Sequence, residues 1–395
     1  MRYLIIGSGV CGTSAAEELR KIDADAEITL ISTETHRLYS RVLLPRFVKG
    51  VLPRERCFLK KETWYEEQNI RCVFGVFVNE LNVNEQTVST SDGQTFSFDK
   101  LLLATSGNLL KFPDKLHGIS YLRTIDDADE LINLLAECAD LPEEKRRAGI
   151  VGGSFIAVEY INFFAQHKIP TDLFMLEKTF FGSALDDESF AVLQAKIEAE
   201  GIRLHTNTSV KKLLGTNHLE GLQTADKEFS LSLLGVGIGI RPDFSWIKNV
   251  GIEVNRGILT NEFLETNAPN IYAAGDVAEF YDSFAERQVI VGNWLNAQAQ
   301  GRTVAKTMGG ERTAFSAVRA YSTNVCGNEI IFIGDTDVGF ADKIVRRGSR
   351  EENGVTQIFV RNEKIVGATL VNRNAERAEL TKMIQEKASA NESSE

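Results

Sequence analysis

Two glycine-rich stretches in the sequence could bind the phosphates of a dinucleotide. The first, GSGVCG, places Gly7, Gly9 and Gly12 in the spacing G-x-G-x-x-G, directly after an apolar segment. In such a turn the first glycine permits the tight bend, the second lets phosphates approach the backbone, and the third lets helix and strand pack closely. A diphosphate then lies on free N–H groups at the helix N-terminus. Glu34, about 20 residues further on, can hydrogen-bond a ribose. The alternative is a glycine turn without a ligand.

The second stretch, GGSFIAVE at 152–159, departs from the same pattern at two of its three glycines. Gly152, which the tight bend requires, is present and is followed by Gly153. Ala157 at the third position adds one methyl group, and G-x-G-x-x-A is an accepted variant. Ser154 at the second position could crowd a pyrophosphate, but its small hydroxyl could also donate to a phosphate oxygen. Two interpretations therefore stay open, a working nucleotide site and one that has lost its ligand.

An acidic residue near the second turn favours the working site. Glu177 ends the segment TDLFMLE, about 20 residues after the turn. An acid at this place binds the 2′,3′-hydroxyls of NAD and repels the 2′-phosphate of NADP. Lys178 follows it but no arginine does, which favours NADH.

Each glycine turn is expected to lie between a strand and a helix that leads to a second strand, a βαβ unit typical of a parallel sheet. Further apolar strands end on small residues at 98–107, 231–243 and 268–280, and short alternating strands with one helix follow from about 320. The pattern predicts an α/β protein with two Rossmann-like dinucleotide-binding domains plus a small α+β C-terminal domain. Domain boundaries are expected near 112, 243 and 312, which groups 1–112 with 243–312 and separates 113–242 and a C-terminal 313–395.

Composition excludes several classes of protein. The 395 residues carry a formal net charge of −11, which argues against nucleic acid as a partner. No apolar run is long enough for a membrane helix, so we expect no membrane association. The five cysteines are far apart and form no CxxC pair, so free thiols and a cytoplasmic location are expected, with no metal site. Cys11, inside the first turn, is interpreted as a small packing residue, with a reactive thiol as the alternative.

Together with the two glycine turns, the segments LLLATSG at 101–107 and IYAAGDV at 271–277 make the chain resemble the pyridine nucleotide–disulphide oxidoreductases over essentially its whole length. Within that family, ETHRLYSRVLLPR at 34–46 is similar to a segment of rubredoxin and ferredoxin reductases and of the flavin part of NADH-dependent nitrite reductase. Disulfide-using branches carry cysteine in this region, whereas this chain has none between Cys11 and Cys57. The resemblance therefore implies that electrons leave the flavin directly.

The resemblance implies FAD at the first glycine turn, with Glu34 on the adenosine ribose and Arg41 neutralising the diphosphate. The other implied FAD contacts are Val78, Ala104, Thr105, Gly275, Asp276 and Trp294. Asp276 also follows a predicted strand, and ligands bind at the carboxyl ends of strands in α/β sheets; an ordinary helix N-cap is the alternative. Trp294 begins a helix whose N-terminus would stabilise negative charge on reduced flavin. The alternative for the Trp294 side chain is simple core packing.

At the second turn the resemblance implies NADH, with Gly237 and Gly239 bordering the nicotinamide. It also implies two catalytic residues. Glu159 would reach the junction of flavin and nicotinamide and pair there with a basic residue, for which this chain offers Arg46 where lysine is usual. Arginine forms a rigid fork and does not release a proton, so Arg46 is a poor proton donor. The alternative for Glu159 is an ordinary surface position on a helix.

The resulting prediction is an FAD-dependent NADH oxidoreductase that passes electrons to a small rubredoxin- or ferredoxin-like protein. Basic residues in 37–56 and in 343–350 could attract such an acidic partner, with plain surface charge as the alternative. The other functions left open are an NADH oxidase, the flavin subunit of a larger reductase such as nitrite reductase, and a flavin-bound scaffold or sensor. The chain is expected to be a monomer or a homodimer.

Overall fold

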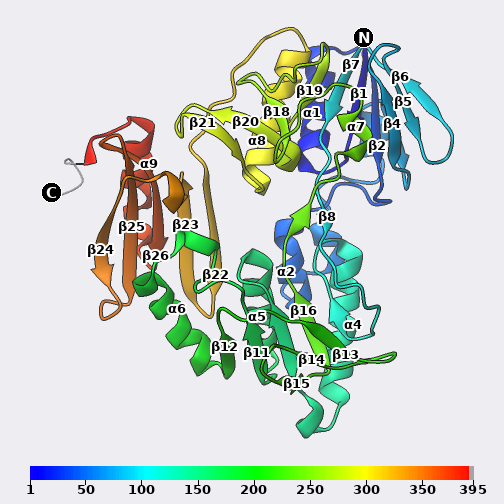
Figure 1. Cartoon of the computed structure of the whole chain (residues 1–395). Coiled ribbons are helices and arrows are strands. Elements are labelled where there is room, and N and C mark those ends of the chain that lie inside the picture. The colour runs from blue at the N-terminus through cyan, green and yellow to red at the C-terminus, as the bar shows by residue number, and fades with distance from the viewer. Residues whose placement is uncertain (391–395) are drawn as a thin grey trace. The chain divides into compact units, whose positions relative to one another are not determined.

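The computed structural model describes residues 1–390, without the side chain of Ser183. The chain forms two compact units (Figure 1). The first unit comprises Met1–Val42, Pro53–Asn108 and Ile240–Ala317, and the second comprises Leu43–Leu52, Leu109–Gly239 and Val318–Glu395. The chain passes from one unit to the other within β8 (Asn108–Leu109) and again just before β17 (Ile240–Arg241). The three-domain assignment made from the sequence stays a prediction.

The first unit is built on a parallel five-stranded sheet in the order β19-β7-β1-β2-β3. These strands are short and apolar, and β1 buries four of its five residues, as expected for a parallel sheet covered on both faces. Their bounds are β1 (Arg2–Ile6), β2 (Glu27–Ser32), β3 (Ile70–Phe74), β7 (Lys100–Leu103) and β19 (Ile271–Ala273). All carboxyl ends lie at one edge because the strands are parallel.

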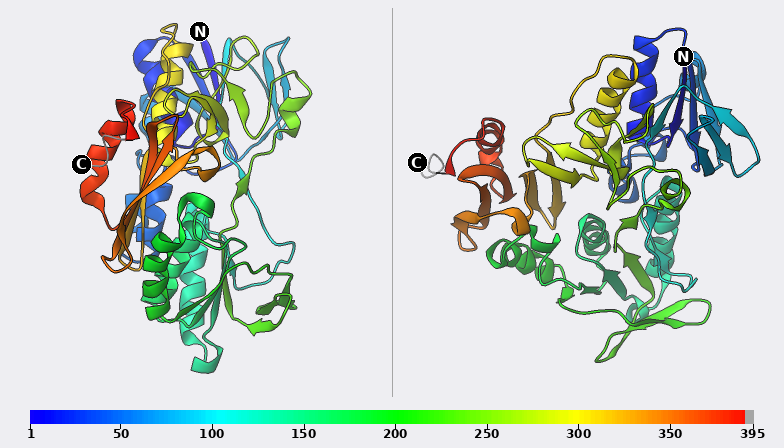
Figure 2. Two further views of the ribbon diagram at one scale, coloured as in Figure 1. Left: turned by 60° about the vertical axis from the view of Figure 1, so that its left-hand side comes forward. Right: turned by 45° about the horizontal axis from the view of Figure 1, so that its top comes forward.

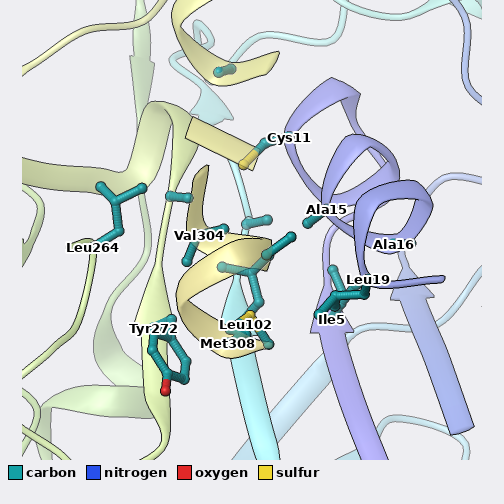
Figure 3. Packing of buried hydrophobic residues seen from close by; sticks show 14 of the residues in the cluster. Ile5, Cys11, Ala15, Ala16, Leu19, Leu102, Leu264, Tyr272, Val304 and Met308 are labelled. Atoms are coloured by element: carbon teal, nitrogen blue, oxygen red, sulfur yellow. The ribbon is translucent and has the colours of Figure 1, made fainter. Parts of the chain in front are cut away.

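Two helices, α1 (Val10–Ile22) and α8 (Trp294–Met308), pack together on one face of this sheet (Figure 3). Their contact is close because small residues lie in it: a Cβ on Gly301 would come within 2.3 Å of the Cys11 carbonyl oxygen. The core between helices and sheet includes Ile5, Ala15, Leu19, Leu102, Val304 and Met308. This packing fixes the first glycine turn against α8.

The opposite face of the sheet is covered by an antiparallel meander and by α7, which share a second apolar cluster with Leu4, Ile6 and Leu101. A further three-stranded sheet, β18-β20-β21, completes the first unit. The bounds are β4 (Val78–Asn82), β5 (Thr87–Thr90), β6 (Thr95–Ser97), α7 (Ser245–Lys248), β18 (Ile258–Thr260), β20 (Ala278–Asp282), β21 (Arg287–Ile290), α3 (Trp64–Glu67), η1 (Arg41–Leu43), η2 (Arg54–Cys57) and η5 (Gly275–Val277).

The second unit repeats this plan with a parallel sheet in the order β12-β11-β10-β16-β9 and its own meander, β13-β14-β15. The bounds are α2 (Leu44–Val48), β9 (Ile119–Ser120), α4 (Ile125–Asp140), η3 (Glu143–Lys145), β10 (Ala148–Val151), α5 (Phe155–Gln166), β11 (Thr171–Phe174), η4 (Gly182–Ala184), α6 (Asp187–Ala199), β12 (Ile202–His205), β13 (Lys212–Gly215), β14 (Leu219–Gln223), β15 (Glu228–Ser230) and β16 (Leu233–Val236). Thr124 begins α4 with a capping box, in which Thr124 and Asp127 satisfy each other's backbone N–H groups.

The last part of the second unit is an antiparallel sheet in the order β22-β23-β26-β25-β24, with α9 over one face (Figure 2). The bounds are β22 (Ala320–Val325), β23 (Asn328–Gly334), η6 (Val338–Phe340), β24 (Lys343–Ser349), β25 (Gly354–Arg361), β26 (Lys364–Val371), η7 (Asn374–Glu376) and α9 (Arg377–Gln385). Leu380 and Ile384 of α9 are buried against this sheet. The sequence-based prediction of a mixed α/β fold is confirmed.

Candidate functional site

The first glycine turn has the backbone that its spacing predicts. Gly7 follows β1 with φ of +114°, and a Cβ there would lie 2.3 Å from the carbonyl oxygen of Ala104. A Cβ on Gly12 would lie 1.9 Å from the carbonyl oxygen of Gly7, so only glycine fits either position. Gly9 caps α1 without a side chain, and a Cβ on it would meet nothing within 4 Å. The turn therefore leaves open space beside the uncapped N–H groups of α1, which fits a diphosphate.

Glu34 lies just after β2, in a network that sequence reasoning identified only in part. Its carboxylate accepts hydrogen bonds from the hydroxyl of Tyr39 and from the guanidinium of Arg41. The acid predicted for a ribose and the arginine predicted for a diphosphate are thus brought together. Tyr39 is the member that the sequence analysis missed, although it stands in the Tyr-x-Arg pattern that ends in Arg41.

The ends of β7 and β19 bring two further predicted segments to the same edge of the sheet as the glycine turn. Ala104 and Thr105 follow β7, and Asp276 follows β19, which pairs with β7. The Asp276 carboxylate accepts from Ser106 Oγ at 2.9 Å, and Gly275 before it has φ of +81°. Because all strands of this sheet are parallel, their carboxyl ends gather these residues where α/β sheets bind ligands.

The remaining residues predicted for FAD lie on other elements of the first unit. Val78 begins β4 and packs, partly buried, in the apolar cluster on the sheet face opposite α1 and α8. Trp294 is the first residue of α8 and packs, partly buried, against the main core. The N-terminus of α8 is capped by Asn293, whose Oδ1 accepts from the Asn296 backbone N–H at 2.8 Å. This cap satisfies one of the helix's free N–H groups and leaves the others.

The second glycine turn keeps the same backbone despite its substitutions. Gly152 has φ of +123°, and a Cβ there would lie 2.2 Å from the carbonyl oxygen of Gly237. Ser154 is the extended N-cap of α5, and its hydroxyl makes no capping bond, which leaves it able to donate to a ligand. Ala157 is fully buried, and Gly237 lies against the start of α5, where a Cβ on Gly237 would be 2.8 Å from the Ala157 nitrogen. The turn fits a pyrophosphate.

Glu177 lies beside the second turn, and Gly239 follows Gly237 by two residues. The Glu177 carboxylate oxygen Oε2 would lie 3.6 Å from a Cβ on Gly153, so the acid is adjacent to the turn. Gly239 has φ of +100° and open space beside it. Lys178 pairs with Asp187, with 2.5 Å between Nζ and Oδ2. An exposed carboxylate beside the turn fits the hydroxyls of a ribose.

An aromatic group joins the second turn to the C-terminal sheet, and no sequence signal pointed to it. The ring of Phe155, the first residue of α5, lies 4.8 Å from that of Phe181, 5.3 Å from that of Tyr321 and 5.9 Å from that of Phe332, between centroids. Phe181 has a left-handed backbone with φ of 59°, which is strained for a bulky residue. Its N–H donates to the Gly153 carbonyl at 2.7 Å. The loop after Glu177 is thereby held against the turn.

The predicted pairing of Glu159 with Arg46 is wrong in this structure, because Glu159 pairs with Lys49, with 3.6 Å between Nζ and Oε2. Helix α2 buries Leu44 and Val48, and this orientation leaves Arg46 exposed while Lys49 at the helix end is half-buried. Burial raises the pKa of the Glu159 carboxyl, and the Lys49 charge opposes that rise. A lysine thus lies beside Glu159 after all, three residues beyond the position chosen from the sequence.

The two basic stretches predicted as docking surfaces are partly neutralised by carboxylates within their own units. Arg37 pairs with Glu55 at 3.1 Å and with Glu62 at 3.0 Å. In the C-terminal part, Arg346 pairs with Asp186 at 2.5 Å. Arg347 lies 3.6 Å from both Glu376 and Glu379. This pairing offsets part of the positive charge that the sequence alone suggested.

Cys11, inside the first glycine turn, is buried. Burial raises the pKa of its thiol, which is consistent with a packing residue. Among residues 1–390, no group of three or more His, Cys, Asp or Glu side chains is arranged to hold a metal ion. Within the described part of the chain, none of the helices has the length and apolar character needed to cross a bilayer.

Comparison with known proteins agrees with this geometry. A family profile described as pyridine nucleotide-disulphide oxidoreductase matches residues 1–301. Nitrite reductase [NAD(P)H] of Bacillus subtilis is 27% identical over 401 residues, which cover 100% of this chain but only 48% of that protein. The chain thus spans about half the length of that relative. NADH-rubredoxin oxidoreductase of Clostridium acetobutylicum is 27% identical over 94% of this chain and 90% of its own.

Solved structures with the same fold include reductases of small redox proteins. The crystal structure of NADH:rubredoxin oxidoreductase from Clostridium acetobutylicum matches with a TM-score of 0.79 and 25% identity, over 98% of this chain and 96% of that chain. Putidaredoxin reductase, in its covalent complex with putidaredoxin, matches with a TM-score of 0.90 and 24% identity, over 98% and 93% of the two chains. The latter likeness establishes the fold alone.

Proposed function

The chain belongs to the pyridine nucleotide-disulphide oxidoreductase family, and on that premise we propose that it passes electrons from NADH through FAD to a small redox protein of the rubredoxin or ferredoxin kind. The observation that carries this proposal is the pair of glycine turns, both with the backbone a dinucleotide needs. Relatives named for rubredoxin reduction align over at least 94% of this chain.

We assign the two cofactors to the two parallel sheets. Residues 1–112 and 243–312 form the FAD domain, 113–242 form the NADH domain, and 313–395 form an interface domain, in this proposal. The full G-x-G-x-x-G turn and the acid Glu34 support FAD in the first sheet. The second turn and Glu177 support NADH in the second. The five cysteines are far apart in the sequence and form no CxxC pair, which fits a reducing compartment, so we place the chain in the cytoplasm.

When bound, FAD accepts a hydride from the nicotinamide and passes electrons on one at a time. The chain's own part is mainly binding and orientation. In the first unit, the N-terminus of α1 beside Gly9 holds the diphosphate and Glu34 holds the adenosine ribose. Asp276 accepts from cofactor hydroxyls at the carboxyl end of β19.

In the second unit, the free hydroxyl of Ser154 and the N-terminus of α5 hold the pyrophosphate of NADH. Glu177 accepts hydrogen bonds from the ribose 2′- and 3′-hydroxyls, and its charge repels the 2′-phosphate of NADPH. Gly237 and Gly239 leave the backbone accessible where β16 ends. These roles make NADH the preferred nucleotide.

Glu159 and Lys49 form the group that can hold or move a proton. Burial raises the pKa of the Glu159 carboxyl above its ordinary value, and a carboxyl with a raised pKa is suited to exchanging a proton during turnover. Lysine as a residue type can take part in proton transfer, whereas arginine does not. We therefore assign Glu159 and Lys49, and not Arg46, as the charged pair of the site.

A second function, flavin subunit of a larger reductase, is favoured by one observation. The 395 residues align with 48% of the Bacillus subtilis nitrite reductase, so the rest of that protein lies outside the aligned region. In that case the acceptor is a redox centre outside residues 1–395 rather than a free small protein.

The experiment that tests the proposal is anaerobic turnover of purified, FAD-loaded protein with NADH and a purified rubredoxin, and separately with a [2Fe–2S] ferredoxin. The proposal predicts NADH-dependent bleaching of the acceptor's visible absorbance, slower with NADPH. If the flavin is reduced but neither acceptor is, and oxygen alone reoxidises it, the small-protein acceptor is wrong and an oxidase function replaces it.

A further inference from the structure

Helix α8 contains a side chain that the proposed function does not use, the fully buried Gln300. Its Oε1 accepts a hydrogen bond from the backbone N–H of Gly275 at 2.7 Å. Its Nε2 is buried and has no hydrogen-bond partner among residues 1–390. An unpaired buried donor costs about 1–3 kcal/mol, and an apolar side chain of similar size would avoid that cost. A function for the Oε1 atom would explain why glutamine is present.

The group that Gln300 holds is the peptide leading into Asp276. Gly275 has φ of +81°. Glycine adopts this conformation freely, but it has no side chain whose contacts could hold the peptide there. A Cβ on Gly275 would lie 3.1 Å from the Cβ of Cys11 and 3.3 Å from its Sγ, so this peptide runs close to the first glycine turn. Figure 3 shows the sulfur of Cys11 directed away from α1 into this contact.

The position of Gln300 is itself tightly fixed. Its neighbour Gly301 lies against the backbone of α1, where a Cβ would be 2.3 Å from the Cys11 carbonyl oxygen. Helix α8 therefore cannot shift relative to the glycine turn without a clash, and its glutamine reaches the Gly275 N–H from a rigid base. On the other side, Ser106 Oγ donates to the Asp276 carboxylate at 2.9 Å.

From these contacts we propose that Gln300 is a positioning residue, which holds the Gly275–Asp276 peptide so that the Asp276 carboxylate is preset for FAD. The inference rests on the proposed function, since it takes the first unit as the FAD site. Gln300 acts through Asp276 and does not need to touch the cofactor. Its contribution is to remove the freedom of a glycine-containing loop before FAD binds.

The test is a double-mutant cycle on FAD affinity with Gln300→Met, Asp276→Asn and the double variant. Flavin release is followed by the rise in flavin fluorescence, with secondary structure checked by circular dichroism. Gln300→Met removes the acceptor at similar volume, and we expect it to weaken FAD binding by about tenfold. In the Asp276→Asn background the same change should cost less than about threefold, because the residue it positions is already impaired.

A matched control is Gln288→Met, the same chemical change on β21 of the same unit. Gln288 Nε2 donates to the Thr260 carbonyl at 3.2 Å, away from any residue of the proposed site. This variant should lower the melting temperature while leaving FAD affinity within about twofold, which separates loss of stability from loss of positioning.

Three results would overturn the inference. The first is a folded Gln300→Met variant with unchanged FAD affinity. The second is a double variant whose loss of FAD affinity is the product of the two single losses. The third is a Gln288→Met variant that loses as much FAD affinity as Gln300→Met. If Gln300→Met does not fold, Gln300→Glu replaces it: the acceptor is kept, and FAD affinity should fall as rising pH ionises that carboxyl beside Asp276. Affinity independent of pH would contradict the proposal. A wild-type protein that binds no FAD would instead refute the proposed function.

Discussion

The two glycine turns have nearly the same backbone but reach it with different residues. At both, the first glycine has a positive φ and no room for a Cβ, because the carbonyl oxygen of Ala104 or of Gly237 would lie 2.3 Å or 2.2 Å away. At the third position the turns differ. Gly12 packs so closely on its own turn that a Cβ would lie 1.9 Å from the Gly7 carbonyl oxygen, whereas the second turn carries the buried methyl of Ala157 at this position.

The difference shows that the pattern G-x-G-x-x-G does not record every position where space is needed. In the first unit the third position has no room for a side chain. In the second unit a methyl fits there, and the close approach that requires glycine is at the strand end, where a Cβ on Gly237 would lie 2.8 Å from the Ala157 nitrogen. At the second position, Gly9 leaves open space whereas Ser154 adds a free hydroxyl. We therefore treat the second turn as adapted for its nucleotide rather than degraded.

The largest effect is expected from exchanging the residues at the third motif position of the two turns. Gly12→Ala places a methyl 1.9 Å from the Gly7 carbonyl oxygen, so the turn must open by a large shift of backbone. We expect purified protein without bound FAD and a loss of several kcal/mol in stability, on the order of 3 kcal/mol. The opposite change, Ala157→Gly, should cost about 1 kcal/mol from helix propensity and leave NADH affinity within about twofold. Retention of FAD by Gly12→Ala would show that the close packing is not required.

A smaller effect is expected at the acid beside the second turn. Glu177→Ala removes the acceptor for the ribose hydroxyls and the charge that repels a 2′-phosphate. NADH affinity should fall by about tenfold and the preference over NADPH should narrow, as measured by isothermal calorimetry with both nucleotides. Lys178→Ala is the matched control, since that lysine pairs with Asp187. Equal effects of the two variants would assign no ribose role to Glu177.

The charged pair of the second unit gives a prediction about pH. Lys49 favours the ionised form of Glu159, whose pKa burial raises. Lys49→Met should raise that pKa further, because it removes the charge that favours the ionised form. The pH-dependent step in the rate of flavin reduction by NADH should therefore move to higher pH. Arg46→Met should leave the step where it is, because Arg46 is exposed and Glu159 pairs with Lys49. A shift in the arginine variant alone would restore the original assignment.

The smallest effect concerns the serine that distinguishes the second turn. If the free hydroxyl of Ser154 donates to the pyrophosphate, Ser154→Gly should weaken NADH binding by about threefold, although it makes the motif look more regular. NADH binding is measured by quenching of flavin fluorescence under anaerobic conditions without dithionite. Tighter binding by Ser154→Gly would mean that the serine side chain crowds the nucleotide.

The sequence was sufficient to predict both βαβ units, both turns and the acids that follow them, because glycine spacing and strand–helix alternation are local signals. It was not sufficient for contacts that depend on how helices are oriented. Arg46 was chosen over Lys49 because position in a motif cannot show which face of a short helix is buried. The aromatic contacts of Phe155 and the bond from Gly275 to Gln300 join segments far apart in the chain, for which no local pattern exists.

The measurement that tests the account most directly is an anaerobic titration of the FAD-loaded protein with NADH, followed by its visible absorbance. The account predicts full bleaching of the flavin band by about one equivalent of NADH, with NADPH much less effective at the same concentration. If dithionite bleaches the band but neither nucleotide does, the second turn does not deliver electrons to the flavin. That result would contradict the conclusion that Ser154 and Ala157 are adaptations of a working nucleotide site.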